Sequence, residues 1–228
     1  MTGTGIGASV RRKEDFRFVT GKGRYTDDVN RPGQAHAYFI RSPHAHAAIN
    51  RIDASEALKT RGVLAVYTGD DIAADKVGGL ICGWMIHSKD GSPMKAGAHP
   101  ALAQGKVRYV GDHVAVVIAE TWALARDAAE KVVVDYTVLP ANADTAAAAR
   151  SGAPVVHDVA PNNVVYDWAL GDKGATDAAF AKAKHVTKLE IVNNRLVPNP
   201  MEPRAAVGDY DDGNDSFTLY TTSQNPHV

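Results

Sequence analysis

The chain has 228 residues, of which 45% are hydrophobic, so it is long enough to bury a core as one large domain or two modest ones. Its 25 basic and 26 acidic side chains nearly balance, which argues against a nucleic-acid-binding protein that depends on a basic surface. The single cysteine, Cys82, excludes an internal disulfide framework and is typical of a reducing compartment. Because no stretch resembles a secretory signal or a membrane span, we expect a cytoplasmic location, with export in complex with a partner as the alternative.

Short strands and turns dominate the first third of the sequence, and a helix of about six residues is expected from Ser55 to about Thr60. Asp53 and Glu56 have the spacing of a capping box for this helix, and Gly62 is placed to end it. Residues 75–105 are rich in Gly, Pro and His, and we interpret them as a long functional or interfacial loop. The expected strands are 35–40, 49–52 and 63–67, the last of them closed by a turn at 68–70.

The clearest pattern is a strand–helix–strand unit in the middle of the chain. The continuous apolar run 114–119 predicts a strand that is covered on both faces. Thr121 is placed to cap a helix with apolar residues at helical spacing. The β-branched run 132–136 then predicts a second strand.

The last part of the chain predicts a hairpin. Thr176 and Asp177 are expected to open a helix that ends at Lys184, and residues 185–197 alternate as a long strand should. Two strands, 205–210 and 216–222, flank a strong turn signal at 211–214. Because the final strand runs into a polar loop, we expect these residues to be the front part of a larger protein.

Several polar residues are candidates for chemistry. His44 and His46 would lie on one face of an extended segment, but no other ligand completes a metal site by spacing, so a structural or interface role is favoured over a metal-dependent hydrolase. Cys82 has His87 five residues away, which does not make it a nucleophile. Asp112 and His113 could form a dyad, although a loop role is more typical.

Two further features lie near the C-terminal end. Prolines at 198, 200 and 203 fix the backbone around Glu202, which is either aimed by that rigidity or simply paired with Arg204 at the surface. Gln224 follows the last expected strand. Its amide both donates and accepts hydrogen bonds, so it could hold an oxo group or an oxyanion without adding charge.

An ordered series of motifs runs from about Ile6 to Val228, comprising residues 11–15, 21–28, 41–47, 110–121, 128–136, 139–141, 171–173, 200–204 and 222–227. Together these motifs resemble the N-terminal portion of the molybdopterin-binding large subunit of the xanthine dehydrogenase, aldehyde oxidase and carbon monoxide dehydrogenase family. Gly171-Asp172-Lys173, followed by residues 176–183, is most similar to the carbon monoxide dehydrogenase branch. His113 departs from the proline or small residue usual at its position, which affects only local loop shape.

The resemblance implies an α+β fold with four parts. Residues 1–17 would form an extended N-terminal arm, and residues 18–145 an α/β hammerhead domain. Residues 146–165 would be a linker. Residues 166–228 would be the first, incomplete part of a molybdopterin-binding domain.

The resemblance also implies an oxidoreductase that hydroxylates a small substrate, such as carbon monoxide, an aldehyde or an N-heterocycle, with water as the oxygen source. Its molybdenum–molybdopterin centre would pass electrons to 2Fe-2S clusters and FAD on partner subunits. In this family a glutamine at the position of Gln224 hydrogen-bonds the oxo group of that centre. We expect no catalytic residue and no metal ligand in this chain, because the family's catalytic glutamate, its Gly-rich loop and the substrate-specific loop fall outside it.

The implied partners are the remainder of the molybdenum subunit, an FAD-binding medium subunit and a 2Fe-2S small subunit, in a dimer of heterotrimers. No nucleic acid or membrane partner is expected, and these residues alone are expected to be inactive. An alternative is a non-catalytic hammerhead module that acts in assembly or docking and is completed by another chain.

Overall fold

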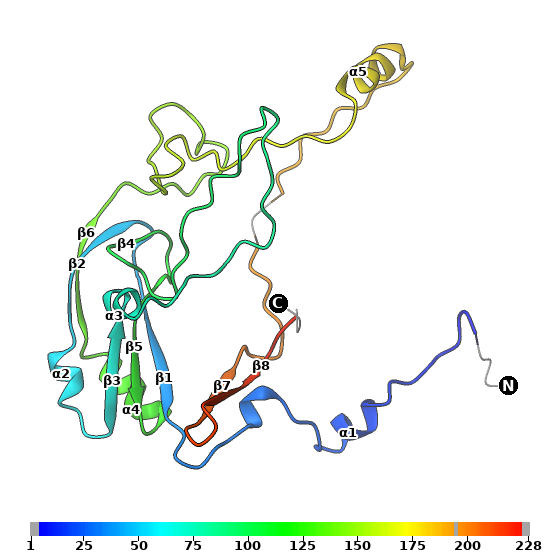
Figure 1. The fold of residues 1–228 in the computed structure, drawn as a ribbon. Coiled ribbons are helices and arrows are strands. Elements are labelled where there is room, and N and C mark those ends of the chain that lie inside the picture. Colours follow the sequence, from blue (N-terminus) through cyan, green and yellow to red (C-terminus); the bar gives the residue numbers. More distant parts are fainter. Residues whose placement is uncertain (1–4, 194–195, 225–228) are drawn as a thin grey trace. The chain divides into compact units, whose positions relative to one another are not determined.

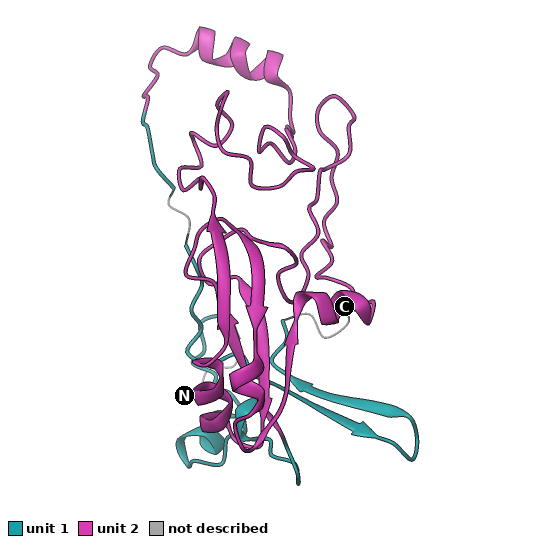
Figure 2. Cartoon of the chain, turned by 90° about the vertical axis from the view of Figure 1, so that its left-hand side faces the viewer, with its two compact units in different colours: residues 1–34, 189–228 teal, residues 35–188 magenta. Residues whose placement is uncertain are grey.

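The computed structural model describes residues 5–193 and 196–224, and the chain divides into two compact units (Figure 2). Unit 1 combines residues 1–34 with 189–228, and unit 2 spans residues 35–188. In chain order (Figure 1) the elements are α1 (Asp15–Val19), η1 (Thr26–Asp28), β1 (His36–Arg41), β2 (Ala47–Asp53), α2 (Ser55–Leu58), β3 (Val63–Thr68), α3 (Gly69–Ala74), β4 (Lys106–Val107), β5 (His113–Ala119), α4 (Trp122–Ala129), β6 (Val133–Val138), α5 (Lys173–Lys182), β7 (Ala206–Asp211) and β8 (Ser216–Thr221).

Unit 2 contains two antiparallel sheets of three strands each. One sheet has the order β1-β5-β3 and the other the order β4-β2-β6. Helices α2 and α4 pack on the first sheet. The strands expected at 35–40, 49–52, 63–67, 114–119 and 132–136 are confirmed, and the mixture of helices with antiparallel sheets is the predicted α+β class.

Strand β5 is the centre of the core and is covered on both of its faces, as its continuous apolar sequence predicts. Val114 lies in a buried cluster with Ala47 and Val107, which belong to the second sheet. Val117, on the opposite face of the strand, lies in a separate cluster with Ala57 and Ala128 from the helices. β5 therefore connects two layers of apolar packing.

Helix α4 begins where the sequence predicts. The hydroxyl oxygen of Thr121 accepts a hydrogen bond from the backbone N–H of Leu124 at 3.2 Å, which makes Thr121 the N-cap. Ala125 and Ala128 are fully buried on the inner side of the helix, where their small side chains allow close packing. The chain then enters β6, so the helix directly links the two sheets.

The predicted capping box at α2 is wrong. The carboxylate of Asp53 accepts a hydrogen bond from the backbone N–H of Ser55, and Glu56 forms an ion pair with Lys59 at 2.6 Å instead of reaching back. A capping box forms instead at α3, which was expected to be a turn. There the backbone N–H and the hydroxyl of Thr68 both donate to Asp71, each at 2.7 Å.

Three further expectations need correction. Helix α5 begins three residues before the predicted start, because the carboxylate of Asp172 accepts from the N–H of Ala175 at 2.9 Å and acts as the N-cap. Residues 185–193 and 196–197 do not form the predicted long strand; no described segment pairs with them, and an unpaired backbone is not held in a ladder. Part of the expected extended arm is helical, since α1 begins at Asp15.

The two long loops of unit 2 differ in how they are held. Residues 75–105 contain an isolated bridge between His87 and Pro93, and the backbone N–H groups of Lys89 and Lys95 donate to the carbonyl oxygens of Asp167 and Val165 at 2.8 and 3.0 Å. In the predicted linker, Asn163 uses its side-chain amide to donate to the carbonyl oxygens of Ala148 at 2.9 Å and Pro154 at 2.8 Å. Asn163 thus joins separate parts of this loop.

Candidate functional site

Gln224 lies at the end of the hairpin formed by β7 and β8. The two strands pair antiparallel, with Val207 opposite Tyr220, and the N–H of Thr222 adds a bond to the carbonyl oxygen of Ala205 at 3.3 Å. Gln224 therefore comes two residues after the last paired position, and its side chain is exposed. The rest of the expected polar loop, residues 225–228, lies outside the described residues.

The other end of the hairpin is a tightly bonded turn. Asp211 accepts hydrogen bonds from the side chain of Asn214 at 2.6 Å and from the N–H of Gly213 at 3.0 Å. These bonds lower the pKa of the Asp211 carboxyl, and the bond from Asn214 has the largest effect. Tyr210 and Phe217 stack across the strands with ring centroids 4.7 Å apart. The hairpin is thus fixed at its turn, as the sequence predicted.

Arg31, which no motif in the sequence marks, contacts both strands of the hairpin. Its guanidinium forms an ion pair with Asp209 at 3.0 Å, donates a hydrogen bond to the hydroxyl of Tyr220, and lies 5.0 Å from the centre of the Tyr220 ring. Arg31 and Tyr220 are 189 positions apart in the sequence, so no local pattern predicts their contact.

His44 and His46 have structural roles in the described structure. The Nδ1 atom of His46, which is buried, bonds to the carbonyl oxygen of Pro140 at 2.8 Å. The imidazole of His44 packs edge-on against Tyr136, with ring centroids 5.0 Å apart. Among the described residues, no group of three or more His, Cys, Asp or Glu side chains is arranged to hold a metal ion. Both imidazoles therefore make contacts within unit 2.

Cys82 is exposed, and its thiol donates to the backbone carbonyl oxygen of Trp84 at 3.6 Å. A carbonyl oxygen cannot act as a general base, so this contact does not activate the sulfur. The thiol lies at an open hollow of about 920 Å³ that is also lined by Arg108 and His157. The pKa of His157 is lowered mainly by burial and to a smaller extent by the positive charge of Arg108. Both effects favour the neutral imidazole.

Asp112, which directly precedes β5, and His113, its first residue, each contact other residues. The carboxylate of Asp112 accepts from the backbone N–H of Arg108 at 3.0 Å. The ring of His113 packs against Phe39, with centroids 4.9 Å apart. Burial, followed by the charge of Arg41, lowers the pKa of His113. Near the C-terminal end, Glu202 and Arg204 do not form the ion pair that was one interpretation of that segment.

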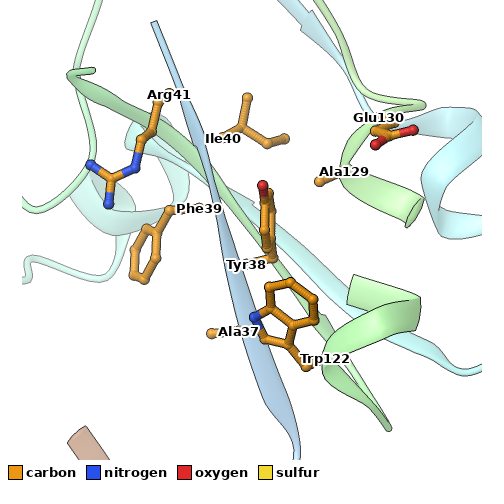
Figure 3. A pocket seen from close by; sticks show the side chains of 8 residues that line it. All are labelled: Ala37, Tyr38, Phe39, Ile40, Arg41, Trp122, Ala129 and Glu130. Atoms are coloured by element: carbon orange, nitrogen blue, oxygen red, sulfur yellow. The ribbon is translucent and has the colours of Figure 1, made fainter. Parts of the chain in front are cut away.

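A second hollow, of about 510 Å³, lies along the edge strand β1 (Figure 3). Tyr38 and Trp122 meet there edge-to-face, with ring centroids 5.8 Å apart. Arg41 and Phe39 point to the other side of the strand (Figure 3). The hollow holds aromatic surface but no cluster of groups suited to acid–base chemistry, so it is not the candidate catalytic site.

Comparison with known proteins places both halves of the chain. Residues 20–140 match the family model described as "Aldehyde oxidase and xanthine dehydrogenase, a/b hammerhead domain", and residues 156–228 match "Molybdopterin cofactor-binding domain". The carbon monoxide dehydrogenase large chain of Afipia carboxidovorans is 37% identical across 98% of this chain, and the nicotine 6-hydroxylase large subunit of Paenarthrobacter nicotinovorans is 36% identical across 97%. The chain spans 28% and 26% of those two proteins.

The solved structures give the same picture. Quinoline 2-oxidoreductase from Pseudomonas putida 86 superposes with a TM-score of 0.83 at 35% identity, over 96% of this chain and 27% of that one. The part of the chain that the structure describes holds no helix long and apolar enough to cross a membrane. These similarities confirm the resemblance and the fold class that the sequence motifs predicted.

Proposed function

Because the chain belongs to the aldehyde oxidase and xanthine dehydrogenase family, we propose that it is the N-terminal portion of the large, molybdenum-carrying subunit of a molybdenum hydroxylase. One observation carries this proposal: a hammerhead match at residues 20–140 is followed, in that order, by a molybdopterin cofactor-binding match at residues 156–228. The proposed substrate class is carbon monoxide, an aldehyde or an N-heterocycle, in line with the names of its relatives, among which is also an aldehyde oxidoreductase.

We also propose the domain division that the sequence motifs imply. Residues 1–17 form an N-terminal arm, 18–145 the hammerhead domain, 146–165 a linker and 166–228 the start of the molybdopterin-binding domain. The proposed partners are the remainder of the subunit, an FAD-binding subunit and a 2Fe-2S subunit, in a dimer of heterotrimers. A cytoplasmic location suits the single exposed thiol of Cys82.

Gln224 is the residue of this chain that we propose to contact the molybdenum–molybdopterin cofactor. When bound, the cofactor supplies oxidation of the substrate with water as the source of oxygen. The described site fits such a contact: the Gln224 side chain is exposed beyond the last strand pair, and its amide offers a donor without a charge. A neutral donor held by a strand end suits a preorganised contact to a polar group of the cofactor.

The test uses the complete subunit assembled with its partners. We expect the purified complex to contain molybdenum and to reduce an electron acceptor with at least one of the three substrate classes. Gln224→Ala should lower kcat by roughly 10²-fold, the usual cost of one preorganised donor. Gln104→Ala removes another exposed glutamine, outside the site, and should leave kcat unchanged. A complex without molybdenum and without turnover would overturn the proposal.

One observation favours the alternative of a non-catalytic docking module. The hairpin exposes large apolar side chains: Phe217 is 81% exposed and Leu219 is 66% exposed. Such a surface suits a protein contact as well as the interior of a completed domain. Assembly with the partner proteins in the absence of any molybdenum would support this alternative.

A further inference from the structure

The end of β8 is held from one side by the N-terminal segment of the same unit. Tyr220 is the one β8 residue that is partly buried, while the other five are exposed. Thr222, two residues further on, lies on the same face of an extended chain. Its hydroxyl lies 3.4 Å from the hydroxyl of Thr26. Two separate contacts therefore hold the segment that leads to Gln224.

Arg31 supplies the main contact because it joins both strands. Tyr220 is opposite Val207 and Asp209 is opposite Thr218, so Tyr220 and Asp209 are diagonal neighbours on one face of the hairpin. The guanidinium binds Asp209 at 3.0 Å and the Tyr220 hydroxyl, and it also lies over the Tyr220 ring. We call Arg31, Asp209 and Tyr220 the arginine clamp.

The value of the clamp lies in geometry more than in charge. The side chains of Arg31 and Asp209 are each 41% exposed, and an ion pair so open to water contributes little to stability. A planar guanidinium that bonds two partners and stacks on a ring, however, restricts the position of all three groups. Backbone contacts support Arg31 in turn, since its N–H donates to the Gln34 side chain at 3.0 Å.

We propose that Arg31 is a positioning residue that acts through Tyr220 to aim Gln224, four residues along the chain. This inference rests on the proposed function, because it assumes that Gln224 meets the cofactor. Without the clamp, β8 keeps its pairing to β7 but its last residues gain freedom on the side now covered by Arg31. A displacement of about 1 Å at a reacting centre is enough for a large loss of rate.

The test compares variants of the complete, cofactor-loaded complex. Arg31→Met, which removes the charge and the bonds, should lower kcat about tenfold with a much smaller change in KM and with normal molybdenum content. The electron paramagnetic resonance spectrum of the partly reduced enzyme should also change, because it reports the surroundings of the metal independently of turnover. Tyr220→Phe keeps the ring and should cause a smaller change of the same kind.

Arg31→Lys and Arg12→Met are the matched comparisons. Lysine keeps a positive charge to pair with Asp209, but it lacks the planar guanidinium that binds Asp209 and Tyr220 together. Compared with Arg31→Met, Arg31→Lys should therefore have a higher kcat and a spectrum closer to that of the wild type. Arg12 belongs to the same unit and pairs with Asp15 at the same 3.0 Å, but it does not touch the hairpin. Its replacement should change neither readout.

Three results overturn the inference in different ways. If Gln224→Ala changes rate and spectrum while Arg31→Met changes neither, the clamp does not position Gln224 and the proposed function stands. If Gln224→Ala also leaves both readouts unchanged, the proposed role of Gln224 fails, and the inference about Arg31 fails with it. Loss of molybdenum from Arg31→Met alone would assign Arg31 to assembly and would also overturn the inference.

Discussion

The Nδ1 atom of His46 lies 2.8 Å from the carbonyl oxygen of Pro140, although the two residues are 94 positions apart in the sequence. Because a carbonyl oxygen only accepts, Nδ1 must carry the hydrogen and donate this bond. Nε2 is buried and has no hydrogen-bond partner among the described residues. The bond ties His46, which directly precedes β2, to Pro140, two residues after β6, so it joins the two strands at one end of the second sheet.

Replacing His46 should therefore destabilise unit 2. We expect His46→Ala to lower the free energy of unfolding by about 2–3 kcal/mol, because it removes a buried hydrogen bond and leaves a cavity. Urea denaturation of the 228-residue chain measures this change. His185→Ala, at an exposed position of the same unit, should cost less than about 0.5 kcal/mol. Equal effects of the two variants would contradict a structural role for His46.

Gly69 is required by a close approach of two backbones. A Cβ atom at this position would lie 2.2 Å from the carbonyl oxygen of Ala103. Ala103 cannot easily move, since its N–H donates to the carbonyl oxygen of His113 at 2.7 Å. Gly69→Ala should therefore lower the free energy of unfolding by about 1–3 kcal/mol, the usual cost of overpacking.

The control for Gly69 is Gly83, where an added Cβ would meet no atom within 4 Å. Gly83→Ala should leave the urea midpoint unchanged or raise it slightly, because alanine restricts the unfolded chain. If Gly69→Ala behaved like Gly83→Ala, the proximity of α3 to Ala103 would not be a constraint on the fold.

The sequence predicts the elements that depend on local patterns. The apolar run of β5, the Thr121 cap and the turn at Asp211 are each specified within a few residues, and all three form. The same kind of local signal misleads where two interpretations compete. Asp53 and Glu56 fit a capping box but bond elsewhere, whereas Thr68 and Asp71 have equivalent spacing and do form one.

Long-range features are beyond such patterns. Residues 185–197 alternate as a strand should, but a strand also needs a neighbour, and the described segments supply none. Arg31 carries no local signal, because its partners Asp209 and Tyr220 come from the other end of the sequence. Gln224 could be selected only through the family motif, since an exposed amide at a strand end is common and weakly informative by itself.

The N-cap of α4 tests whether a single side-chain hydrogen bond stabilises this helix. Thr121→Ala should lower the free energy of unfolding by about 1 kcal/mol, because the N–H of Leu124 loses its 3.2 Å partner. Thr121→Ser retains a hydroxyl at the same atom and should restore most of that loss. The measurement is again urea denaturation. If Ser and Ala were equally destabilising, the methyl group of Thr121 and not its hydrogen bond would stabilise the helix.

His113 should make the protein less stable as the pH falls. Its folded-state pKa is lowered mainly by burial and to a smaller extent by the charge of Arg41, whereas in the unfolded chain its pKa is about 6.5. Below that pH the unfolded state takes up a proton that the folded state refuses, so the free energy of unfolding decreases until the pH reaches the lowered folded pKa. Above about pH 6.5 both states are neutral and the full stability is present.

His113→Gln, which is neutral at every pH, should flatten this part of the pH dependence. The measurement is the free energy of unfolding of wild type and variant at several values between about pH 7.5 and about pH 5. The pKa of His157 is lowered for the same first reason, burial, so His157→Gln should flatten the profile further when combined. Hydrogen bonds lower the pKa values of the Asp71 and Asp211 carboxyls. The stability that these two groups contribute is therefore lost only at more acidic pH, outside the range in which the histidine variants are compared. An unchanged slope in both variants would show that neither imidazole is kept neutral by the fold.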